Sequence, residues 1–395
     1  MMERLTRSGN ESAALGAKLS RAEVIPVYPI TPSTFIAEYL AQYVSDGELK
    51  AKLINVESEH SAMSACIGAS LAGARTFTAT SSQGLALMHE MLHWAVGART
   101  PVVMAVGNRA LAPPWNLYAH HQDSIAQRDT GWIEFYCESN QEVLDTIIQA
   151  YKVAEDKRVL LPAMVCLDGF ILTHTRERVN LPQQNVVDDY LPPYSPEHFV
   201  IDFDHPLTEN VIVTPAWYME YQYQLEVAMR NSREVIREAN RDFANKFHRN
   251  WGGLVDPYFM EDADVAVMTM GTIAGIARVA VREMREASHK VGLIKLRAFR
   301  PFPIEEIRKL GSQLKVLAVI DRNCAFGSGG ASYIETQSAL YNTPNSPKVL
   351  GFIAGLGGRD VSVADIKHVL DAALKVSKTG KVEREVEWVK LVGGE

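Results

Sequence analysis

Short apolar runs alternate with amphipathic segments along the first part of the chain. The apolar runs predict strands at 23–27, 52–56, 76–80, 101–106 and 163–168. The amphipathic segments predict helices at 10–21, 34–44, 85–96 and 146–154. The run 101–106 is apolar throughout, which is typical of a parallel strand buried on both faces. We therefore expect an α/β fold, with a parallel sheet covered by helices on both faces.

The same alternation resumes near residue 262. It predicts strands at 265–270, 291–295 and 316–320, and helices at 273–287, 304–313 and 363–375. Residues 180–215 hold six prolines without periodicity and predict an extended connector, which a long helix at 217–248 follows. We expect the charged tail to be solvated or to lie on a partner. The chain thus divides into a first domain at 1–180, a connector with its helix at 181–255, and a smaller α/β domain at 256–395.

Composition excludes several function classes. The chain has 395 residues, with 40 Lys and Arg against 47 Asp and Glu, so its formal charge of -7 argues against a nucleic-acid surface. No apolar run approaches the 18 or so residues of a membrane span. The first 29 residues carry scattered charges and lack the apolar segment of a secretory signal. We expect a cytoplasmic enzyme that binds neither nucleic acid nor membrane.

The metal-binding residue types do not form a predicted site. The four cysteines are Cys66, Cys137, Cys166 and Cys324. No two of them share a CxxC spacing, so we expect buried thiols and no iron–sulfur cluster on this chain. His89 and His93 lie four residues apart on an apolar helix, and without an acidic or Cys partner at ligand spacing they favour packing over metal binding. We therefore predict no metal site here.

Glu59 is the first candidate for chemistry. It follows an apolar run and begins a predicted helix. A carboxylate in the first turn of a helix commonly serves only to complement the helix dipole. The rest of this helix, as far as Ala74, carries mainly Ala, Gly and Ser, although Gly and Ser weaken a helix relative to Ala. We expect these small side chains to allow the close approach of a partner helix or a flat ligand.

Two further polar residues follow predicted strands. Thr31 lies in a strand-to-helix turn, where it is either an N-cap or a substrate contact, because ligands bind at the carboxyl ends of parallel strands. Arg109 follows the buried strand 101–106 directly, and an Arg fork binds a carboxylate through two parallel hydrogen bonds. A surface ion pair is the alternative for Arg109. Residues 112–123 then form a long loop with two prolines, of the kind that is often functional.

Several of these segments match one known family in the same order. Beside the stretch 55–84, the matches are YPITPS at 28–33, TATSSQG at 78–84, NRA at 108–110, HQDS at 121–124 and DRN at 321–323. On these residues the chain resembles the α subunits of the thiamine-diphosphate-dependent 2-oxoacid:ferredoxin oxidoreductases, in their pyruvate and oxalate branch. The resemblance implies a pyrimidine-binding domain followed by a smaller domain like the C-terminal domain of transketolase.

The resemblance also implies roles for particular residues. Glu59 would be catalytic, holding the aminopyrimidine ring of thiamine diphosphate so that the thiazolium carbon can lose its proton. Pro29 and Ser82 would join Glu59 in binding the cofactor. Thr31 and Arg109 would bind the substrate carboxylate. The reaction is an oxidative decarboxylation whose electrons pass to ferredoxin.

The chain lacks parts that this reaction needs. It has no cluster cysteines, and no Gly-Asp-Gly followed by Asn at the spacing of a Mg-diphosphate site. The resemblance therefore implies thiamine diphosphate shared with a partner, and Mg²⁺ and [4Fe-4S] clusters on partner subunits. The partners would be a β-type subunit with the diphosphate site, a ferredoxin-like cluster subunit and ferredoxin, in a dimer of hetero-oligomers. The glycine-rich loop at 321–330 lacks a phosphate-binding spacing, so packing or subunit contact is expected there.

His120 bears on the substrate. Members of the pyruvate type commonly carry an acidic residue immediately before HQD, where this chain has His120. If the loop reaches the substrate, losing that anion favours a more negative ligand, so the prediction leans to oxalate; otherwise His120 faces solvent. Pyruvate with coenzyme A is the alternative. Larger 2-oxoacids need a pocket that Pro113, Pro114 and Trp115 are expected to restrict, and a non-catalytic scaffold subunit is the alternative of another class.

Overall fold

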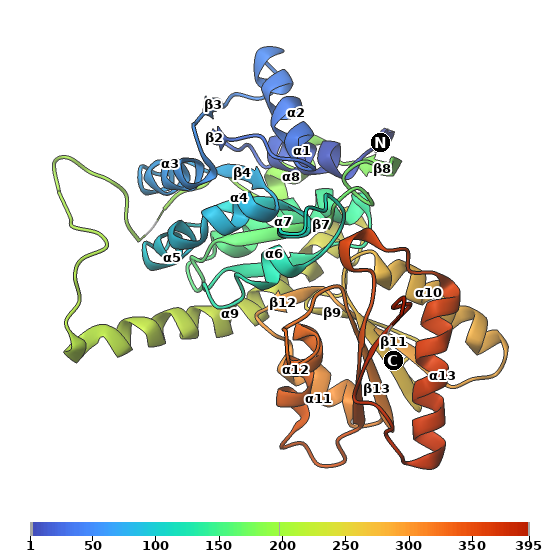
Figure 1. Cartoon of the computed structure of the whole chain (residues 1–395). Helices are drawn as coiled ribbons and strands as arrows, with labels where there is room; N and C mark the ends of the chain where they lie inside the picture. Colours follow the sequence, from blue (N-terminus) through green and yellow to red (C-terminus); the bar gives the residue numbers. More distant parts are fainter. Residues whose placement is uncertain (1–2, 197, 394–395) are drawn as a thin grey trace.

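Two α/β units joined by a long helix make up the chain (Figure 1). The computed structural model describes residues 3–196 and 198–393. The first sheet has the order β12-β6-β7-β5-β4. Its strands are β4 (Phe77–Thr80), β5 (Val103–Asn108), β6 (Ile133–Tyr136), β7 (Ala163–Asp168) and β12 (Ala298–Arg300). All are parallel except β12, which pairs antiparallel with β6 at one edge.

A smaller parallel pair extends the first sheet. It consists of β2 (Val24–Val27) and β3 (Lys52–Asn55), and a bridge between Val24 and Thr76 connects it with the segment before β4. The helices of this unit are α1 (Gly9–Leu19), α2 (Thr34–Ser45), α3 (Glu59–Leu71), α4 (Ser82–Leu87), α5 (His89–Gly97), α6 (Gln122–Ile125) and α7 (Asn140–Ala154). Helix α1 packs on α7, which contacts β5 and β7, while α3 packs on α5 and contacts β2 and β4.

The second sheet has the order β15-β14-β13-β10-β11-β9. Its strands are β9 (Val255–Tyr258), β10 (Val265–Thr269), β11 (Val291–Leu296), β13 (Val316–Asp321), β14 (Lys348–Ile353) and β15 (Val386–Trp388). Its helices are α10 (Ile273–Glu286), α11 (Ile304–Gly311), α12 (Ala331–Leu340) and α13 (Val363–Thr379), with the 3₁₀ turn η1 (Leu356–Gly358). The pairs α10–α13 and α11–α12 cover opposite faces (Figure 1), and only β9 runs antiparallel.

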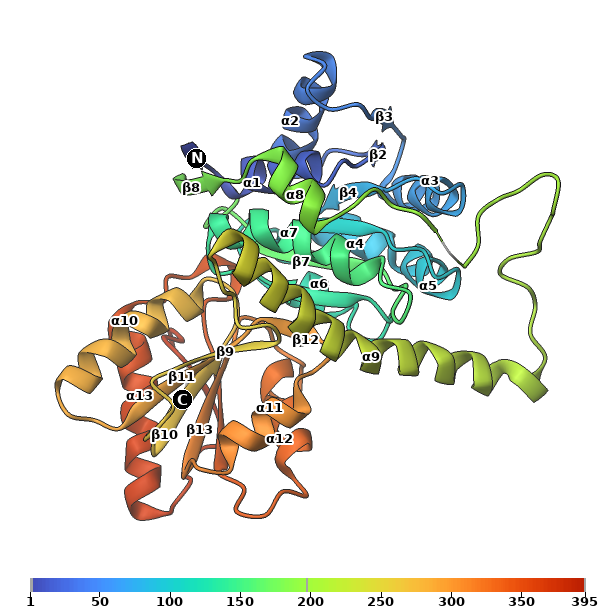
Figure 2. The same ribbon diagram turned by 180° about the vertical axis from the view of Figure 1, so that it is seen from behind.

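The connector is more structured than its sequence predicts. β1 (Glu3–Arg7) and β8 (Glu177–Leu181) form an antiparallel pair, so the predicted boundary at residue 180 lies within a strand. Helix α8 (Gln184–Tyr190) forms inside the segment predicted to be extended, because Val187 and Tyr190 are buried against the rest of the chain. Helix α9 (Pro215–Phe247) follows; its second half is packed, and its first half projects from the body (Figure 2).

The charged tail also differs from its prediction. β15 pairs in parallel with β14 and becomes the edge of the second sheet, where the sequence predicts a solvated or partner-bound segment. The pairing gives the backbone of the tail ladder hydrogen bonds, and side-chain contacts such as Lys390 Nζ to Asp365 Oδ2, 2.6 Å, hold it on the domain.

Buried charges join the two units. Lys295 of β11 places its Nζ 2.6 Å from Glu142 Oε2 of α7, and both side chains are fully buried. Arg297, which is 1% exposed, lies 3.4 Å from the other oxygen of Glu142 and donates to the Gly253 carbonyl. Unpaired charges in such a place would be strongly destabilising. The relative position of the two units is therefore fixed by packing and by paired charges.

Candidate active site

Glu59 begins α3 at the carboxyl-end edge of the first sheet. Ser58 caps the helix by accepting a hydrogen bond from the Ser61 amide, which leaves Glu59 in the first turn. Glu59 is 6% exposed, and no described donor forms a hydrogen bond with its carboxylate. Gly84 lies directly against it, since a Cβ built at Gly84 would come within 2.4 Å of Glu59 Oε1. A buried carboxylate without a protein donor is costly unless a ligand supplies one.

The turn after β4 supplies the next polar groups. Thr80 is fully buried, and its hydroxyl lacks a partner among the described residues; a Cβ at Gly84 would lie 2.5 Å from it. Gln83 Nε2 is likewise buried and unpartnered in this part of the chain. Ser82 has a positive φ of 49° and is fully buried. Its hydroxyl donates to the Ala110 carbonyl at 2.6 Å, so Ser82 holds the turn in place.

Arg109 lies at the end of β5 and is anchored by two protein acceptors. Its Nη1 donates to the Thr31 carbonyl at 2.7 Å and its Nη2 to Gln83 Oε1 at 2.8 Å. Arg109 is 4% exposed, and its Nε has no described partner. Burial lowers the pKa of the guanidinium, and the charge of Asp123 opposes that shift. The Trp115 ring centroid lies 5.9 Å away.

Asp123 holds the turns of the site together through hydrogen bonds. It is fully buried and accepts from the amides of Ser82 (2.9 Å), Arg109 (3.0 Å) and Ser124 (2.8 Å) and from Asn108 Nδ2 (2.9 Å). Burial raises the pKa of Asp123, although these hydrogen bonds favour its charged form. One carboxylate thus fixes the ends of β4 and β5 relative to each other. Sequence analysis matched this residue to a motif without giving it a role.

His121 links the site to the second domain. Its Nε2 lies 2.5 Å from Asp168 Oδ1, and the other oxygen of Asp168 accepts from the amide of Thr272 at 3.0 Å. The His121 amide donates to the Arg322 carbonyl at 2.9 Å. Burial alone would raise the pKa of Asp168, but the charges of Arg322 and His121 hold it well below its usual value. The carboxyl ends of both sheets meet at this cluster.

His120 is largely enclosed. Its Nε2 is buried and finds no partner among the residues described. Burial, followed by the nearby His121 and Arg322, lowers the pKa of His120 to about 4. The imidazole is therefore neutral at pH 7. A neutral imidazole does not attract a dianion such as oxalate as a cationic one would. The prediction of oxalate therefore rests only on the missing acidic residue at position 120.

The remaining predicted residues, Pro29 and Thr31, stand two positions apart on one segment. Pro29 and Thr31 are exposed in the turn that follows β2, and Thr31 contacts Arg109 through its backbone carbonyl. The structure therefore brings Glu59, Thr31 and Arg109 to one edge, with Gly84 and Gln83 between them. Sequence reasoning passed over Gln83 and Gly84 as individual residues, although both stand inside the matched TATSSQG segment.

Other candidate features are accounted for by packing. Asp321 accepts from the amides of Ser332 and Tyr333 at 3.0 Å each, so the carboxylate fills the N-terminus of α12 beside the glycine-rich loop. His89 packs edge-on against His93, with ring centroids 5.1 Å apart. All four cysteines are free and buried, and burial raises the pKa of each thiol. Within the described ranges there is no group of three metal-ligating side chains.

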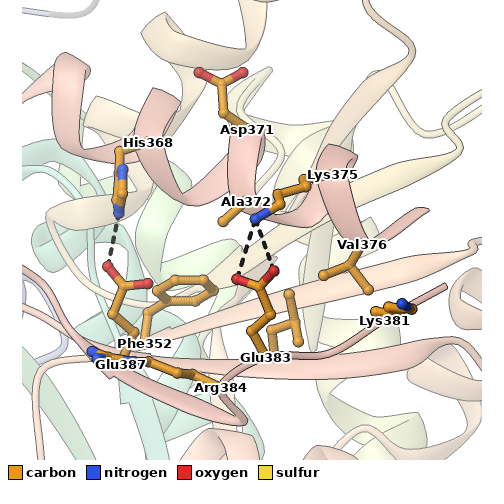
Figure 3. A pocket seen from close by; sticks show the side chains of 12 residues that line it. Phe352, His368, Asp371, Ala372, Lys375, Val376, Lys381, Glu383, Arg384 and Glu387 are labelled. Carbon is orange, nitrogen blue, oxygen red and sulfur yellow. Dashed lines mark hydrogen bonds and ion pairs between the residues drawn. The ribbon is translucent and has the colours of Figure 1, made fainter. Parts of the chain in front are cut away.

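A separate hollow lies between α13 and the tail. Its volume is about 560 Å³, and none of the predicted site residues line it. Figure 3 shows two ion pairs along its wall, His368 with Glu387 at 2.7 Å and Lys375 with Glu383 at 3.0 Å. Its charged groups thus largely neutralise one another, and it lies apart from Glu59 and Arg109.

Comparison with known families identifies the class of protein. A family model described as pyruvate flavodoxin/ferredoxin oxidoreductase, thiamine diphosphate-binding, matches residues 15–241, and one for pyruvate:ferredoxin oxidoreductase core domain II matches 263–366. Pyruvate synthase subunit PorA of Pyrococcus furiosus is 50% identical over 388 residues, 98% of each chain. The chain belongs to the 2-oxoacid:ferredoxin oxidoreductase family. Within this family it corresponds to the α subunits, as its sequence predicts.

Other relatives refine the placement in this family. Ketoisovalerate oxidoreductase subunit VorA of Pyrococcus abyssi is 47% identical over 384 residues, 97% of each chain. A solved 2-oxoglutarate:ferredoxin oxidoreductase from Magnetococcus marinus superposes with a TM-score of 0.71 at 20% identity, over 94% of this chain and 65% of that one. A split-gene transketolase gives a TM-score of 0.54 at 11% identity, over 93% of this chain and 97% of that one. The two structural matches support the predicted fold class.

The comparisons leave the prediction of oxalate without support. The relatives carry the names of pyruvate and ketoisovalerate enzymes, so they favour pyruvate, the stated alternative. The relatives are also named as subunits, which agrees with a chain that acts in a larger assembly. Among the described residues, no helix has the length and hydropathy to cross a membrane.

Proposed function

We propose that this chain is the α subunit of a pyruvate:ferredoxin oxidoreductase, which converts pyruvate and coenzyme A to acetyl-CoA and CO₂. The observation that supports pyruvate is the 50% identity to a pyruvate synthase subunit over 98% of both chains. Ketoisovalerate is the second candidate, because the subunits named for it are nearly as similar, at 47%. Ferredoxin receives the electrons in this family.

The residues at the site fit the pyrimidine end of thiamine diphosphate. Thr80 Oγ1 and Gln83 Nε2 are buried without a described partner, Glu59 is 6% exposed without a described donor, and Glu59 and Thr80 Oγ1 both lie against Gly84. A ring that carries both donors and acceptors would satisfy them. When bound, thiamine diphosphate supplies a carbon nucleophile and an electron sink for decarboxylation.

Glu59 is the residue to which we assign proton chemistry. Its carboxylate can hold a proton shared with a ring nitrogen of the aminopyrimidine, because it is buried and free of protein donors. The small side chains of α3 and Gly84 leave its surroundings open to a flat ring.

Arg109 is the residue to which we assign substrate binding. Thr31 and Gln83 hold the guanidinium plane at two points, so its remaining donors, including Nε, are fixed before a substrate arrives. A 2-oxoacid carboxylate accepts two parallel hydrogen bonds from such a group. Asp123 keeps the Arg109 backbone in place from beneath.

The metal and clusters are proposed to lie on other subunits. The described residues contain neither a three-ligand metal group nor paired cysteines at cluster spacing. We propose that a β-type subunit carries the Mg²⁺ and diphosphate site, that a ferredoxin-like subunit carries the [4Fe-4S] clusters, and that the assembly is cytoplasmic and doubled.

Turnover of the complex purified with its partner subunits tests the proposal. Reduction of a low-potential viologen dye is followed with pyruvate, ketoisovalerate or oxalate, each with and without coenzyme A. The highest kcat/KM with pyruvate, dependent on coenzyme A, is expected. The highest value with ketoisovalerate would replace pyruvate by the second candidate, and reduction by oxalate without coenzyme A would overturn both.

A further inference from the structure

An exposed arm projects from the first domain. The arm comprises residues 198–229, that is, the loop before α9 and the first part of that helix. The Ile201 amide ties the loop to the end of α3 by donating to the Leu71 carbonyl at 2.8 Å, and both overall views show much of the arm extending away from the body (Figures 1 and 2). Eleven of the 26 large exposed hydrophobic side chains in the described chain lie between residues 200 and 223. So dense an exposed apolar cluster marks an interaction surface.

The inner side of the arm continues a buried stripe. From Ala228 onward, α9 buries Ala228, Ser232, Val235, Ile236, Ala239 and Phe243 against the body. The same helical face carries Trp217, Tyr218 and Tyr221 further toward the N-terminus, where they are 65%, 58% and 51% exposed. Because residues three and four apart share a helical face, the stripe that packs on this domain continues along the arm, where Tyr218 and Tyr221 line an open hollow with Arg99. A partner surface lying beside the domain would cover that extension.

The outer side of the arm is apolar as well. Met219 and Tyr223 point away from the stripe on α9 and are 79% and 59% exposed. In the loop, Phe203 and Ile212 are 94% and 100% exposed. A helix with apolar groups on all sides is stable in water only when it is enclosed. The arm therefore fits a cleft that surrounds it better than a flat surface.

The arm is also strongly acidic. Between residues 198 and 229 the sequence has Asp202, Asp204, Glu209, Glu220 and Glu226, and neither Lys nor Arg. Asp202 pairs with His205, and Glu226 with Arg230 at the base of the arm. Glu209 and Glu220 have no basic partner among the described residues and are exposed. A complementary surface would present Lys or Arg around an apolar cleft.

We propose that the arm inserts into an apolar cleft, rimmed by basic side chains, on a different subunit of the complex. This inference rests on the proposed function, in which the chain works only with partner subunits. A second copy of this chain is the less favourable occupant, because a symmetric contact between two arms would bring like charges together. The arm would thus make binding specific for that subunit.

The aromatic part of the arm is tested with the full-length chain carrying Trp217→Ala and Tyr221→Ala together. Its affinity for the other subunits, purified separately and recombined, is expected to fall at least about tenfold, as for aromatic anchors in a cleft. The isolated chain should keep its thermal midpoint, since these side chains are half exposed or more. Tyr341→Ala is the matched control: this tyrosine is 85% exposed outside the arm, and its loss should leave affinity unchanged.

The charge of the arm is tested with Glu209→Lys and Glu220→Lys, which are exposed and should not disturb folding. Affinity for the other subunits should fall, and its dependence on salt should weaken. Wild-type affinity in both arm variants would refute the proposal, as would a dimer of the isolated chain, seen by light scattering, that the aromatic variant dissociates. Because binding is measured without substrate, an error in the proposed substrate would leave these results unaffected.

Discussion

The carboxyl-end edges of the two sheets differ in what their polar groups contact. At the edge of the first sheet, Glu59 lacks a described donor and Arg109 keeps an unpartnered Nε. At the edge of the second, Asp321 accepts from Ser332, Tyr333 and Asn323, all at 3.0 Å. Similar strand–turn–helix geometry therefore produces a carboxylate without a described donor in one domain and a carboxylate that caps a helix in the other.

The comparison separates a site from a merely polar edge. Both edges follow buried parallel strands, and both carry matched family segments, so motif and position alone do not distinguish them. Hydrogen bonding of the two carboxylates does, because Glu59 has no described donor whereas Asp321 has three; Arg322, beside Asp321, nevertheless keeps two buried nitrogens without a described partner. The following predictions test that distinction, from the largest expected effect to the smallest.

Replacing Glu59 by Gln should have the largest effect. Activity of the assembled complex is expected to fall about 10²- to 10⁴-fold, because the carboxylate that shares a proton is lost. Glu57→Gln is the matched control, since Glu57 is exposed and its side chain bonds to Ser61 alone among the described residues. Steady-state turnover of both variants measures the loss of activity, and thermal melting shows whether either variant is destabilised. Unchanged turnover in Glu59→Gln would favour a scaffold subunit.

Conservative changes of the two buried arginines should separate binding from structure. Arg109→Lys is expected to lower kcat/KM about 100-fold, chiefly through a higher KM for the 2-oxoacid, because Lys cannot replace a two-point fork. Arg322→Lys should lower the thermal midpoint and leave KM near its wild-type value. A large KM effect in Arg322→Lys would extend the substrate site to the second domain.

Asp321→Asn should affect stability rather than chemistry. Ser332 donates to Oδ1 and Tyr333 to Oδ2, so the new amide nitrogen faces a backbone N–H whichever oxygen it replaces, and about 1–3 kcal/mol of unfolding free energy should be lost. Denaturant unfolding of the isolated chain measures this loss. The KM of the assembled complex should not change. A selective rise in KM would show that the second edge also touches substrate.

The acid dependence of stability should reveal Asp168. Its pKa lies well below the usual value, so its stabilising contribution is present above about pH 4 and is lost as the pH falls further. Between pH 7 and pH 3, Asp168→Asn should therefore lose less unfolding free energy than wild type, by about 1 kcal/mol or more. Asp188→Asn, which breaks an exposed pair with Arg21, should differ from wild type much less. The assignment would be contradicted if the unfolding free energy of all three proteins fell equally between pH 7 and pH 3.

Much of the fold can be predicted from local patterns. β5 and β7 are continuous apolar runs and β10 and β13 likewise, so their strands could be read from the sequence directly. β6, with the sequence IEFY, has a buried glutamate in the middle of the sheet, which breaks the apolar pattern. β15 has only three residues and forms because β14 offers a free edge. Such elements depend on partners distant in sequence.

The site was predictable only in part, for a similar reason. Glu59 and Arg109 stand at strand and helix ends, which are positions that sequence can identify. Asp123 binds groups from three segments, and Asp168 binds His121 and Thr272, and neither set is visible before the chain folds. The charge state of His120 could not be predicted either, because its burial, which lowers its pKa to about 4, cannot be read from its neighbours in sequence.

Strand β12 bears on how this gene product can be divided. It belongs by sequence to the second domain, yet it closes the first sheet by pairing with β6. A fragment ending near residue 262 would leave the backbone of β6 as a bare edge, open to pairing with other chains. The two halves are therefore expected to express poorly as separate proteins and to recover solubility when produced together. A gene split between the two domains would therefore have to supply another strand, or a covering segment, for the exposed edge of β6.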